Sequence, residues 1–255
     1  MRTNSTKAKL AEGKPVFGAV IAEYALNTVE MFGALGYDYV FLDGEHGSLS
    51  LEHMENLIRA AEVFGITPIC RVPNHMDSTI LQFLDRGAQG IIVPHVNTRE
   101  QAEAVARACR YHPEGHRGIG GARAHDYNVA MPREQSARFI NSQILVITMI
   151  EEVEAVNNIE EIAKVPGVDI MHVASGDLTQ SMGNPGQVEV WRMIDGAIRR
   201  IRAAGKYAGA GGNSPAQTAR VAQLIKTGAN FITIQALDLT RLAAENFRKQ
   251  VNAAL

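Results

Sequence analysis

Cysteine is scarce in this chain: of its 255 residues only Cys70 and Cys109 carry a thiol, and no Cys-x-x-Cys pair occurs. Two isolated cysteines cannot form a disulfide framework or a cysteine-rich zinc site. We therefore expect a protein of a reducing compartment, in practice the cytoplasm.

Long apolar runs and an excess of basic charge are missing as well. No stretch approaches the ~18 consecutive apolar residues that would span a membrane. Residues 1–15 are polar and lack the apolar centre of a signal peptide. The formal net charge is -2, which is no electrostatic footprint for nucleic acid. We expect neither a membrane nor a nucleic acid as partner.

Three catalytic signatures are absent. No Gly-x-Gly-x-x-Gly follows the first predicted strand, so a dinucleotide fingerprint is missing. No Gly-x-Ser-x-Gly elbow supports a serine nucleophile. A Schiff-base mechanism needs a desolvated lysine at the active site, yet no lysine stands at the carboxyl end of a predicted strand. The lysines are Lys7, Lys9, Lys14, Lys164, Lys206, Lys226 and Lys249.

Short apolar stretches that alternate with amphipathic helical patterns dominate what is present. Eight such strand–helix repeats in roughly 250 residues predict an α/β fold, a single (β/α)8 TIM barrel. The domain would span residues 1–255, with an N-terminal segment, residues 1–15, and a closing helix, residues 239–255. An open doubly wound sheet is the alternative. The predicted strands are residues 16–22, 39–42, 67–72, 90–96, 144–150, 169–174, 206–210 and 231–235.

Several local signals mark helix starts and irregular segments. Ser50 and Thr98 are predicted N-caps, and the pair Ser214 and Pro215 is predicted to open a helix. Residues 175–183 are predicted to form a loop or short turn. Residues 111–131 break the alternation, and a long irregular stretch in a compact domain is either a surface crossover or functional.

Polar residues gather where the predicted strands end. In a (β/α)8 barrel the active site lies at the carboxyl ends of the strands, so this asymmetry favours an enzyme over a scaffold. The residues at these ends are Asp43, Glu45, His46, Arg71, His95, Glu151, Glu152, Ser175, Gly176, Asp177, Gly211, Gly212, Asn213, Gln235 and Asp238.

The carboxylates Glu151 and Asp177 follow the fifth and sixth strands. Hard oxygen ligands of this kind suit a divalent cation that keeps positions open for water and substrate. Asp177 would equally serve as a helix N-cap, so both interpretations stay open.

Arg71 and His46 are the other reactive candidates. The guanidinium of Arg71 can bind a carboxylate or a developing enolate oxygen, or form a salt bridge with Glu45 or Asp43. His46 is the natural general acid or base, because its ordinary pKa lies near neutrality. His172 falls inside the sixth strand and is predicted to be a packed histidine rather than a ligand.

Five motifs in order resemble the class II pyruvate aldolases of the HpcH/HpaI family. The resemblance covers nearly the whole chain, about residues 16–244. It implies a barrel enzyme that reversibly cleaves 4-hydroxy-2-oxo acids to pyruvate and an aldehyde through a metal-stabilised pyruvate enolate. The motifs are Leu-Asp-Gly-Glu-His-Gly at 42–47, Cys-Arg-Val-Pro at 70–73, Leu-Asp-Arg-Gly-Ala-Gln-Gly-Ile-Ile-Val-Pro at 84–94, Ile-Glu at 150–151 and Ser-Gly-Asp-Leu-Thr-Gln-Ser-Met-Gly at 175–183.

The resemblance also implies roles for particular residues. Glu151 and Asp177 would bind the divalent cation, Mg²⁺, Mn²⁺ or Co²⁺. Arg71 would contact the pyruvate oxygen. His46 would act as the base, with Asp85 as its partner.

Further roles concern binding and assembly. Asp43 would support His46, and the backbone amides of Ser175, Gly176 and Asp177 would hold the pyruvate carboxylate. The segment 117–123 is similar to one that reaches a neighbouring subunit in the family, so Arg123 would complete the adjacent site. A homo-oligomer, typically a hexamer, is implied.

Three departures from the family pattern bear on the substrate. Met149 stands where many relatives carry glutamine, Ala-Ser-Gly-Asp at 174–177 replaces the commoner Gly-Pro-Ala-Asp, and Gly211 and Gly212 replace bulky aliphatic residues. Because the two glycines lack bulky side chains, the aldehyde pocket is expected to be roomier.

Three alternative functions remain open. They are a decarboxylase or other carbon–carbon lyase, a phosphosugar isomerase with residues 209–213 as phosphate cradle, and a non-enzymatic scaffold.

Overall fold

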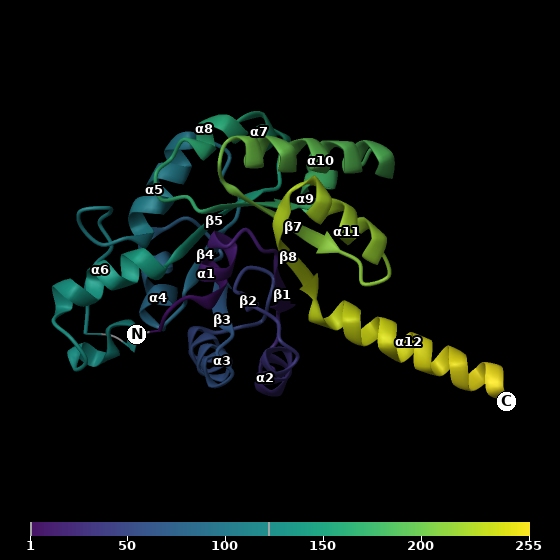
Figure 1. Ribbon diagram of the computed structural model, residues 1–255, viewed down its shortest axis with the longest axis horizontal. Helices are drawn as coiled ribbons and strands as arrows, with labels where there is room; N and C mark the ends of the chain where they lie inside the picture. Colours follow the sequence, from purple (N-terminus) through teal and green to yellow (C-terminus); the bar gives the residue numbers. More distant parts are fainter. Residues whose placement is uncertain (1, 122) are drawn as a thin grey trace.

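Eight parallel strands close into a barrel in the computed structural model, which describes residues 2–121 and 123–255 (Figure 1). Each strand pairs with the next in sequence, and β8 pairs with β1. The predicted (β/α)8 barrel is confirmed, and the alternative of an open doubly wound sheet is excluded. The strands are β1 Val16–Ile21, β2 Tyr39–Asp43, β3 Thr67–Arg71, β4 Gly90–Val93, β5 Leu145–Ile150, β6 Ile170–Ala174, β7 Tyr207–Asn213 and β8 Ala229–Gln235.

The helices surround this barrel and include the two with predicted caps. The His53 amide donates to Ser50 Oγ at 3.1 Å and the Gln101 amide to Thr98 Oγ1 at 3.3 Å, which confirms both caps. The helices are α1 Ser5–Ala11, α2 Leu26–Ala34, α3 Leu51–Val63, α4 Asp77–Asp85, α5 Arg99–Cys109, α6 Arg133–Gln143, α7 Val153–Asn157, α8 Ile159–Ala163, α9 Ser175–Ser181, α10 Gln187–Ala203, α11 Thr218–Thr227 and α12 Ala236–Ala254, with the 3-10 segment η1 Arg123–Asn128.

Apolar side chains form two concentric shells. One fills the barrel interior, with Tyr39, Ile69, Ile147 and Phe231 among its members. The other lies between the strands and the helices. Because both faces of the strands are covered, the strands read as continuous apolar runs instead of alternating ones.

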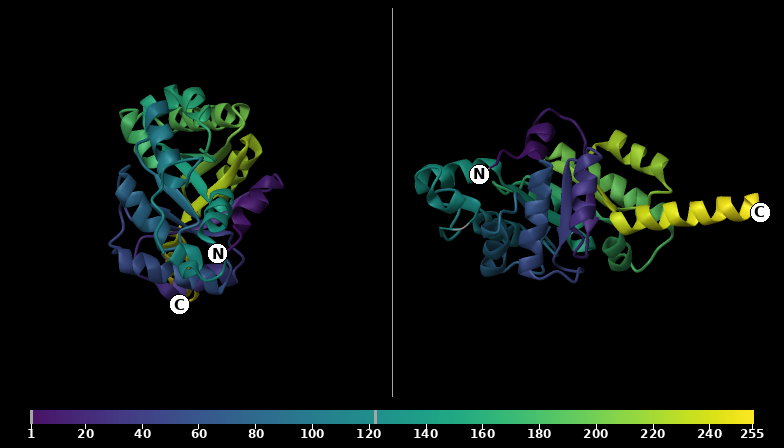
Figure 2. Two further views of the ribbon diagram at one scale, coloured as in Figure 1. Left: turned by 90° about the vertical axis from the view of Figure 1, so that its left-hand side faces the viewer. Right: turned by 90° about the horizontal axis from the view of Figure 1, so that it is seen from below.

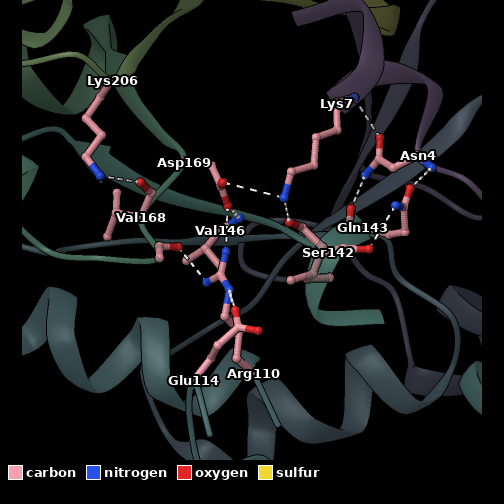
Figure 3. A network of polar contacts seen from close by, with 12 residues as sticks. Asn4, Lys7, Arg110, Glu114, Ser142, Gln143, Val146, Val168, Asp169 and Lys206 are labelled. Atoms are coloured by element: carbon pink, nitrogen blue, oxygen red, sulfur yellow. Dashed lines mark hydrogen bonds and ion pairs between the residues drawn. The ribbon is translucent and has the colours of Figure 1, made fainter. Parts of the chain in front are cut away.

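The N-terminal segment closes the amino end of the barrel. Leu10 of α1 is buried with the inner shell, and a polar network holds the helix in place (Figure 3). Lys7 Nζ donates to the Ile144 carbonyl at 2.8 Å and lies 3.6 Å from Asp169 Oδ1. Asp169 Oδ2 also accepts from Arg110 Nη2 at 3.0 Å. The active end must therefore be the opposite one.

Several predicted boundaries are wrong, among them that of β4, which ends at Val93 and not at Val96. Residues 175–181 form α9 rather than a turn, because the buried Leu178 packs this segment onto the barrel. Ser214 forms a turn, with its carbonyl accepting from the Gln217 amide at 2.9 Å, so α11 begins only at Thr218. Strand β7 continues through Asn213, since pairing with β6 and β8 supports its glycines.

The closing helix begins three residues before the predicted 239 and leaves the body of the molecule. Figure 1 and the right-hand view of Figure 2 show α12 extending away from the barrel to the C-terminus. Ala236 is its only buried residue. Among the described helices, none has the length and apolar character needed to cross a bilayer. Met1 of the predicted N-terminal segment and Ala122 of the segment 117–123 lie outside the described residues.

Candidate active site

Asp43 and Arg71 form a buried ion pair at the carboxyl ends of β2 and β3. The strands set these two residues side by side in register. Arg71 donates from Nε to Asp43 Oδ1 at 2.9 Å and from Nη2 to Oδ2 at 2.6 Å. Burial alone would raise the pKa of Asp43, but the hydrogen bonds and charge of Arg71 outweigh it and lower that pKa. The pair is therefore ionised and fixed in orientation.

Asp43 also shapes the loop that carries Glu45 and His46. Its Oδ1 accepts from the Glu45 amide at 3.1 Å and from the His46 amide at 3.2 Å. Glu45 Oε2 then lies 2.9 Å from Arg71 Nη1, so both salt bridges considered for Arg71 are present. The His46 side chain remains 64% exposed, with Nε2 4.0 Å from Glu45 Oε2. Its imidazole is thus exposed to solvent, beside the Glu45 carboxylate.

Glu151 is almost completely buried and sits among other acids. Burial raises its pKa, and the charges of Asp177 and Glu45 act in the same direction. The His95 amide donates to Glu151 Oε1 at 2.6 Å. His95 Nδ1 lies 2.8 Å from Glu152 Oε1, and its backbone is left-handed at φ 53°. His95 was predicted to lie at a strand end, without a role. Its position just after β4 is the sequence signal that could have pointed to one.

One cavity of about 190 Å³ collects most of the predicted residues. It brings His46, Arg71, Ser175, Gly176 and Asp177 together from three different strand ends. Glu151 is not among the residues that line this cavity, but the charge of Asp177 acts on it electrostatically. The full lining is Val20, Phe41, His46, Arg71, Met149, His172, Ala174, Ser175, Gly176, Asp177, Gly211, Gly212, Thr233 and Gln235.

The departures from the family pattern meet in this cavity. The Met149 sulfur lies 3.8 Å from Arg71 Nη1, so a thioether borders the guanidinium. Gly211 does not simply leave empty room, because the imidazole of His172 occupies part of the space beside it. The predicted packed histidine is indeed buried, but it also lines the cavity.

Asp85 and Arg123 lie elsewhere in this chain. Asp85 ends α4, just before β4, and so is at the amino end of the barrel, where it accepts from Arg117 Nη2 at 2.7 Å. Arg123 is paired with Glu62. Within a single chain, neither Asp85 nor Arg123 therefore lies near His46.

The donor set fits a hard divalent cation. Glu151 is a buried carboxylate whose ionised form is disfavoured by burial and by two acidic neighbours, and a cation beside Asp177 would remove that penalty. Within the described ranges, no group of three or more histidine, cysteine or acidic side chains is placed to hold a metal ion. Any such ion would thus need ligands from water and substrate besides these two carboxylates.

A closed parallel barrel with a buried arginine, an exposed histidine and two carboxylates at its strand ends is typical of a (β/α)8 enzyme. The sequence profile of the HpcH/HpaI aldolase/citrate lyase family matches residues 23–242. The chain belongs to this family and is a carbon–carbon lyase of the class II pyruvate aldolase type.

Relatives with similar names support this assignment. A 4-hydroxy-2-oxovalerate aldolase from Rhodococcus jostii is 38% identical over 81% of this chain and 80% of its own. A 2-keto-3-deoxy-L-rhamnonate aldolase from Shigella sonnei is 33% identical over 91% and 86%. Among solved structures, the citrate synthase SbnG is 31% identical with a TM-score of 0.85, covering 99% of this chain and 100% of the other.

Proposed function

We propose that this protein is a class II aldolase that cleaves 4-hydroxy-2-oxo acids reversibly to pyruvate and an aldehyde. The observation that carries the proposal is the single cavity in which His46, Arg71 and Asp177 converge. Relatives named for such activities support the substrate class. Residues 209–213, considered above as the phosphate cradle of an isomerase, belong to strand β7 and do not form a separate loop.

In this proposal Arg71 binds the 2-oxo acid and stabilises the charge that develops on its oxygen. The guanidinium is already held by Asp43 and Glu45, so it needs no reorganisation during reaction. Ser175, Gly176 and Asp177 line the same cavity, and their first-turn amides would bind the substrate carboxylate.

His46 holds and moves the proton of the 4-hydroxyl group. Its imidazole is exposed at the mouth of the cavity, where a substrate hydroxyl can reach it. Removal of this proton lets the C3–C4 bond break, and the electron pair remains on the pyruvate fragment as an enolate. Protonation at C3 then gives pyruvate.

Glu151 and Asp177 would hold a divalent cation, Mg²⁺, Mn²⁺ or Co²⁺, which when bound supplies Lewis-acid polarisation of the 2-oxo group. Arg71 and Glu151 interact electrostatically, which supports a site in which the guanidinium and the two carboxylates would act on one substrate.

We further propose a cytoplasmic homo-oligomer, a hexamer. Two free, buried cysteines fit a reducing compartment. Helix α12 has only one buried residue and exposes Leu237, Phe247 and Val251, and a helix of this kind gains stability from packing on a partner. Asp85 and Arg123 would then serve the site of a neighbouring copy.

The test is release of pyruvate from a panel of 4-hydroxy-2-oxo acids, with and without EDTA. We expect release with the aldehyde in equal amount, loss on chelation and recovery on adding Mg²⁺, Mn²⁺ or Co²⁺. Glu151→Gln and Asp177→Asn should be inactive at all metal concentrations while retaining the wild-type circular dichroism spectrum.

Two results would contradict the proposal. Full activity of either variant in EDTA would remove the cation assignment. Carbon dioxide release without an aldehyde would instead identify a decarboxylase.

A further inference from the structure

His172 is a buried polar residue inside the barrel to which the proposed reaction gives no task. Its side chain projects from the middle of β6 and is 2% exposed. The ring packs edge-on against Phe231, with centroids 5.6 Å apart. Nδ1 is buried and lacks a hydrogen-bond partner in the part of the chain that the structure describes. A buried nitrogen without a hydrogen bond destabilises the fold. A histidine at this position therefore suggests a function that offsets this cost.

Two glycines of β7 make room for this ring. A Cβ at Gly209 would lie 2.2 Å from His172 Nδ1, and a Cβ at Gly211 would lie 2.5 Å from Nε2. Both distances are far below contact, and the approaching atoms belong to a packed ring. The imidazole therefore fits only because both positions are glycine, and its Nδ1 lies against Gly209.

The other ring nitrogen borders the cavity together with a hydroxyl. The point that a Cβ of Gly211 would occupy is 2.5 Å from His172 Nε2 and 3.1 Å from Thr233 Oγ1. All three residues line the cavity that holds Arg71 and Asp177. The space left by the missing side chain is thus bounded by two polar atoms from adjacent sides.

We propose that His172 and Thr233 form a recognition site for a substrate hydroxyl, so that the preferred substrate carries a hydroxyl beyond the 4-hydroxy-2-oxo acid core. This inference rests on the proposed aldolase function and specifies its substrate class. Such a hydroxyl comes either from the aldehyde, as in a 2-hydroxyaldehyde, or from the donor, as in hydroxypyruvate.

The chemistry of the two side chains favours a hydroxyl over other groups. Burial and the charge of Arg71 lower the pKa of His172 to about 3, so the ring is neutral. A neutral imidazole offers either a donor or an acceptor at Nε2, and a hydroxyl can satisfy both tautomers as well as Thr233. An ammonium group would be repelled by Arg71, and a carboxylate already has partners in Arg71 and the first turn of α9.

The test compares wild-type enzyme, His172→Phe and Thr233→Val in the synthetic direction. Pyruvate is offered glycolaldehyde or acetaldehyde, and in a second arm hydroxypyruvate or pyruvate is offered acetaldehyde. Because the paired substrates differ in intrinsic reactivity, the measured quantity is the change in the ratio of their kcat/KM values. We expect His172→Phe to lower the hydroxyl preference about tenfold in one arm, the effect of about 1.4 kcal/mol.

Thr233→Val should lower the same ratio by a smaller factor, and it decides the question if His172→Phe does not fold. The matched control is Thr148→Val, because Thr148 Oγ1 is also buried, has no hydrogen-bond partner among the described residues and does not line the cavity. Its ratio should equal that of wild type. An unchanged ratio in every folded variant and in both arms overturns the hydroxyl site.

Exchange of the pyruvate C3 protons in D₂O, followed by NMR on the wild-type enzyme, separates this failure from failure of the aldolase proposal. Exchange reports enolate formation and does not depend on the second substrate. If the C3 protons exchange but the variants leave the ratio of kcat/KM values unchanged, only the hydroxyl site is refuted. Absence of exchange, with no pyruvate released from any hydroxy-oxo acid, refutes the aldolase itself.

Discussion

At the scale of single residues, Asp43 organises the site although it lines no part of the cavity. Its Oδ1 and Oδ2 accept from Nε and Nη2 of Arg71, and Oδ1 also accepts from the amides of Glu45 and His46. The charged group that would bind substrate and the loop that carries the proposed base are thus positioned by the same two oxygens. Loss of this carboxylate would disturb both.

The substitution Arg71→Lys tests whether activity requires the planar guanidinium group or only a positive charge. A lysine cannot reproduce the two parallel hydrogen bonds to Asp43 and the contact with Glu45. We expect kcat/KM for pyruvate release to fall by about 100-fold or more, the range for a lost transition-state donor. The exposed Arg99→Lys is the control and should leave kcat/KM unchanged. Wild-type kinetics for Arg71→Lys would contradict the assigned role.

His172 should make the fold sensitive to acid. Its pKa is about 3 in the folded protein against 6.5 ordinarily, because burial and Arg71 oppose its charge. The unfolded chain therefore binds more protons below pH 6.5, and the neutral ring stabilises the fold above that pH. This contribution declines as the pH falls from 6.5 towards 3 and should amount to a loss of about 2 kcal/mol by pH 5.

Urea unfolding of wild type and His172→Phe between pH 7.5 and 5 measures the effect. The free energy of unfolding of the variant should decline less steeply over this range. Parallel curves for the two proteins would show that the pKa of His172 is the same in the folded and unfolded states.

At the scale of elements, helix boundaries depend on whether the signal is local. Ser50 and Thr98 cap their helices as predicted, because a side chain and an amide three residues later suffice. Ser214 and Pro215 offered the same kind of signal but belong to a turn. Helix α9 had no such signal and forms because Leu178 is buried against the barrel.

Ser50→Ala should destabilise the protein by about 1 kcal/mol, since the Oγ–His53 hydrogen bond at the start of α3 is lost. The urea midpoint at pH 7.5 reports the change. Ser50→Asp keeps an acceptor at the cap and should restore most of the stability. Equal loss in both variants would mean that the serine acts through something other than capping.

At the scale of the whole molecule, the single chain leaves two features unexplained. Asp85 and Arg123 lie at the end of the barrel opposite to the cavity, and α12 extends from the body with almost no buried surface (Figure 2). A second copy that packs on α12 and presents its amino end to the cavity would account for both. The proposed oligomer is therefore also a proposal about the site.

Mixing two inactive variants tests the shared site. If Asp85 of one copy serves His46 of another, His46→Ala and Asp85→Asn should each have little activity as pure proteins. Co-expressed, they should recover roughly a quarter of wild-type activity, because random assembly into a symmetric oligomer forms that fraction of intact sites. No recovery in purified mixed oligomers would place Asp85 outside the site of the neighbouring copy.

Removal of residues 239–255 tests the role of α12 in assembly. Since the helix buries only Ala236 on its own chain, the barrel should remain folded while analytical ultracentrifugation shows a smaller species. A full-size assembly after truncation would show that other surfaces hold the copies together.

The barrel, and the end of it at which the candidate site residues lie, could be predicted from the sequence alone. Apolar runs alternating with helical patterns admit few packings, and the polar residues that follow those runs must gather at one rim. Asp43, Arg71, Glu151 and Asp177 were found in this way. Position along the chain was enough, because every parallel strand points its carboxyl end in the same direction.

Only the tertiary structure decided which of these groups meet and what surrounds them. His95 among three acids, the thioether of Met149 beside Arg71, and His172 in the space left by Gly211 come from strands far apart in sequence. Their contacts depend on register and on which face of each strand looks inward. Those quantities are fixed by packing across the barrel, which no local pattern encodes.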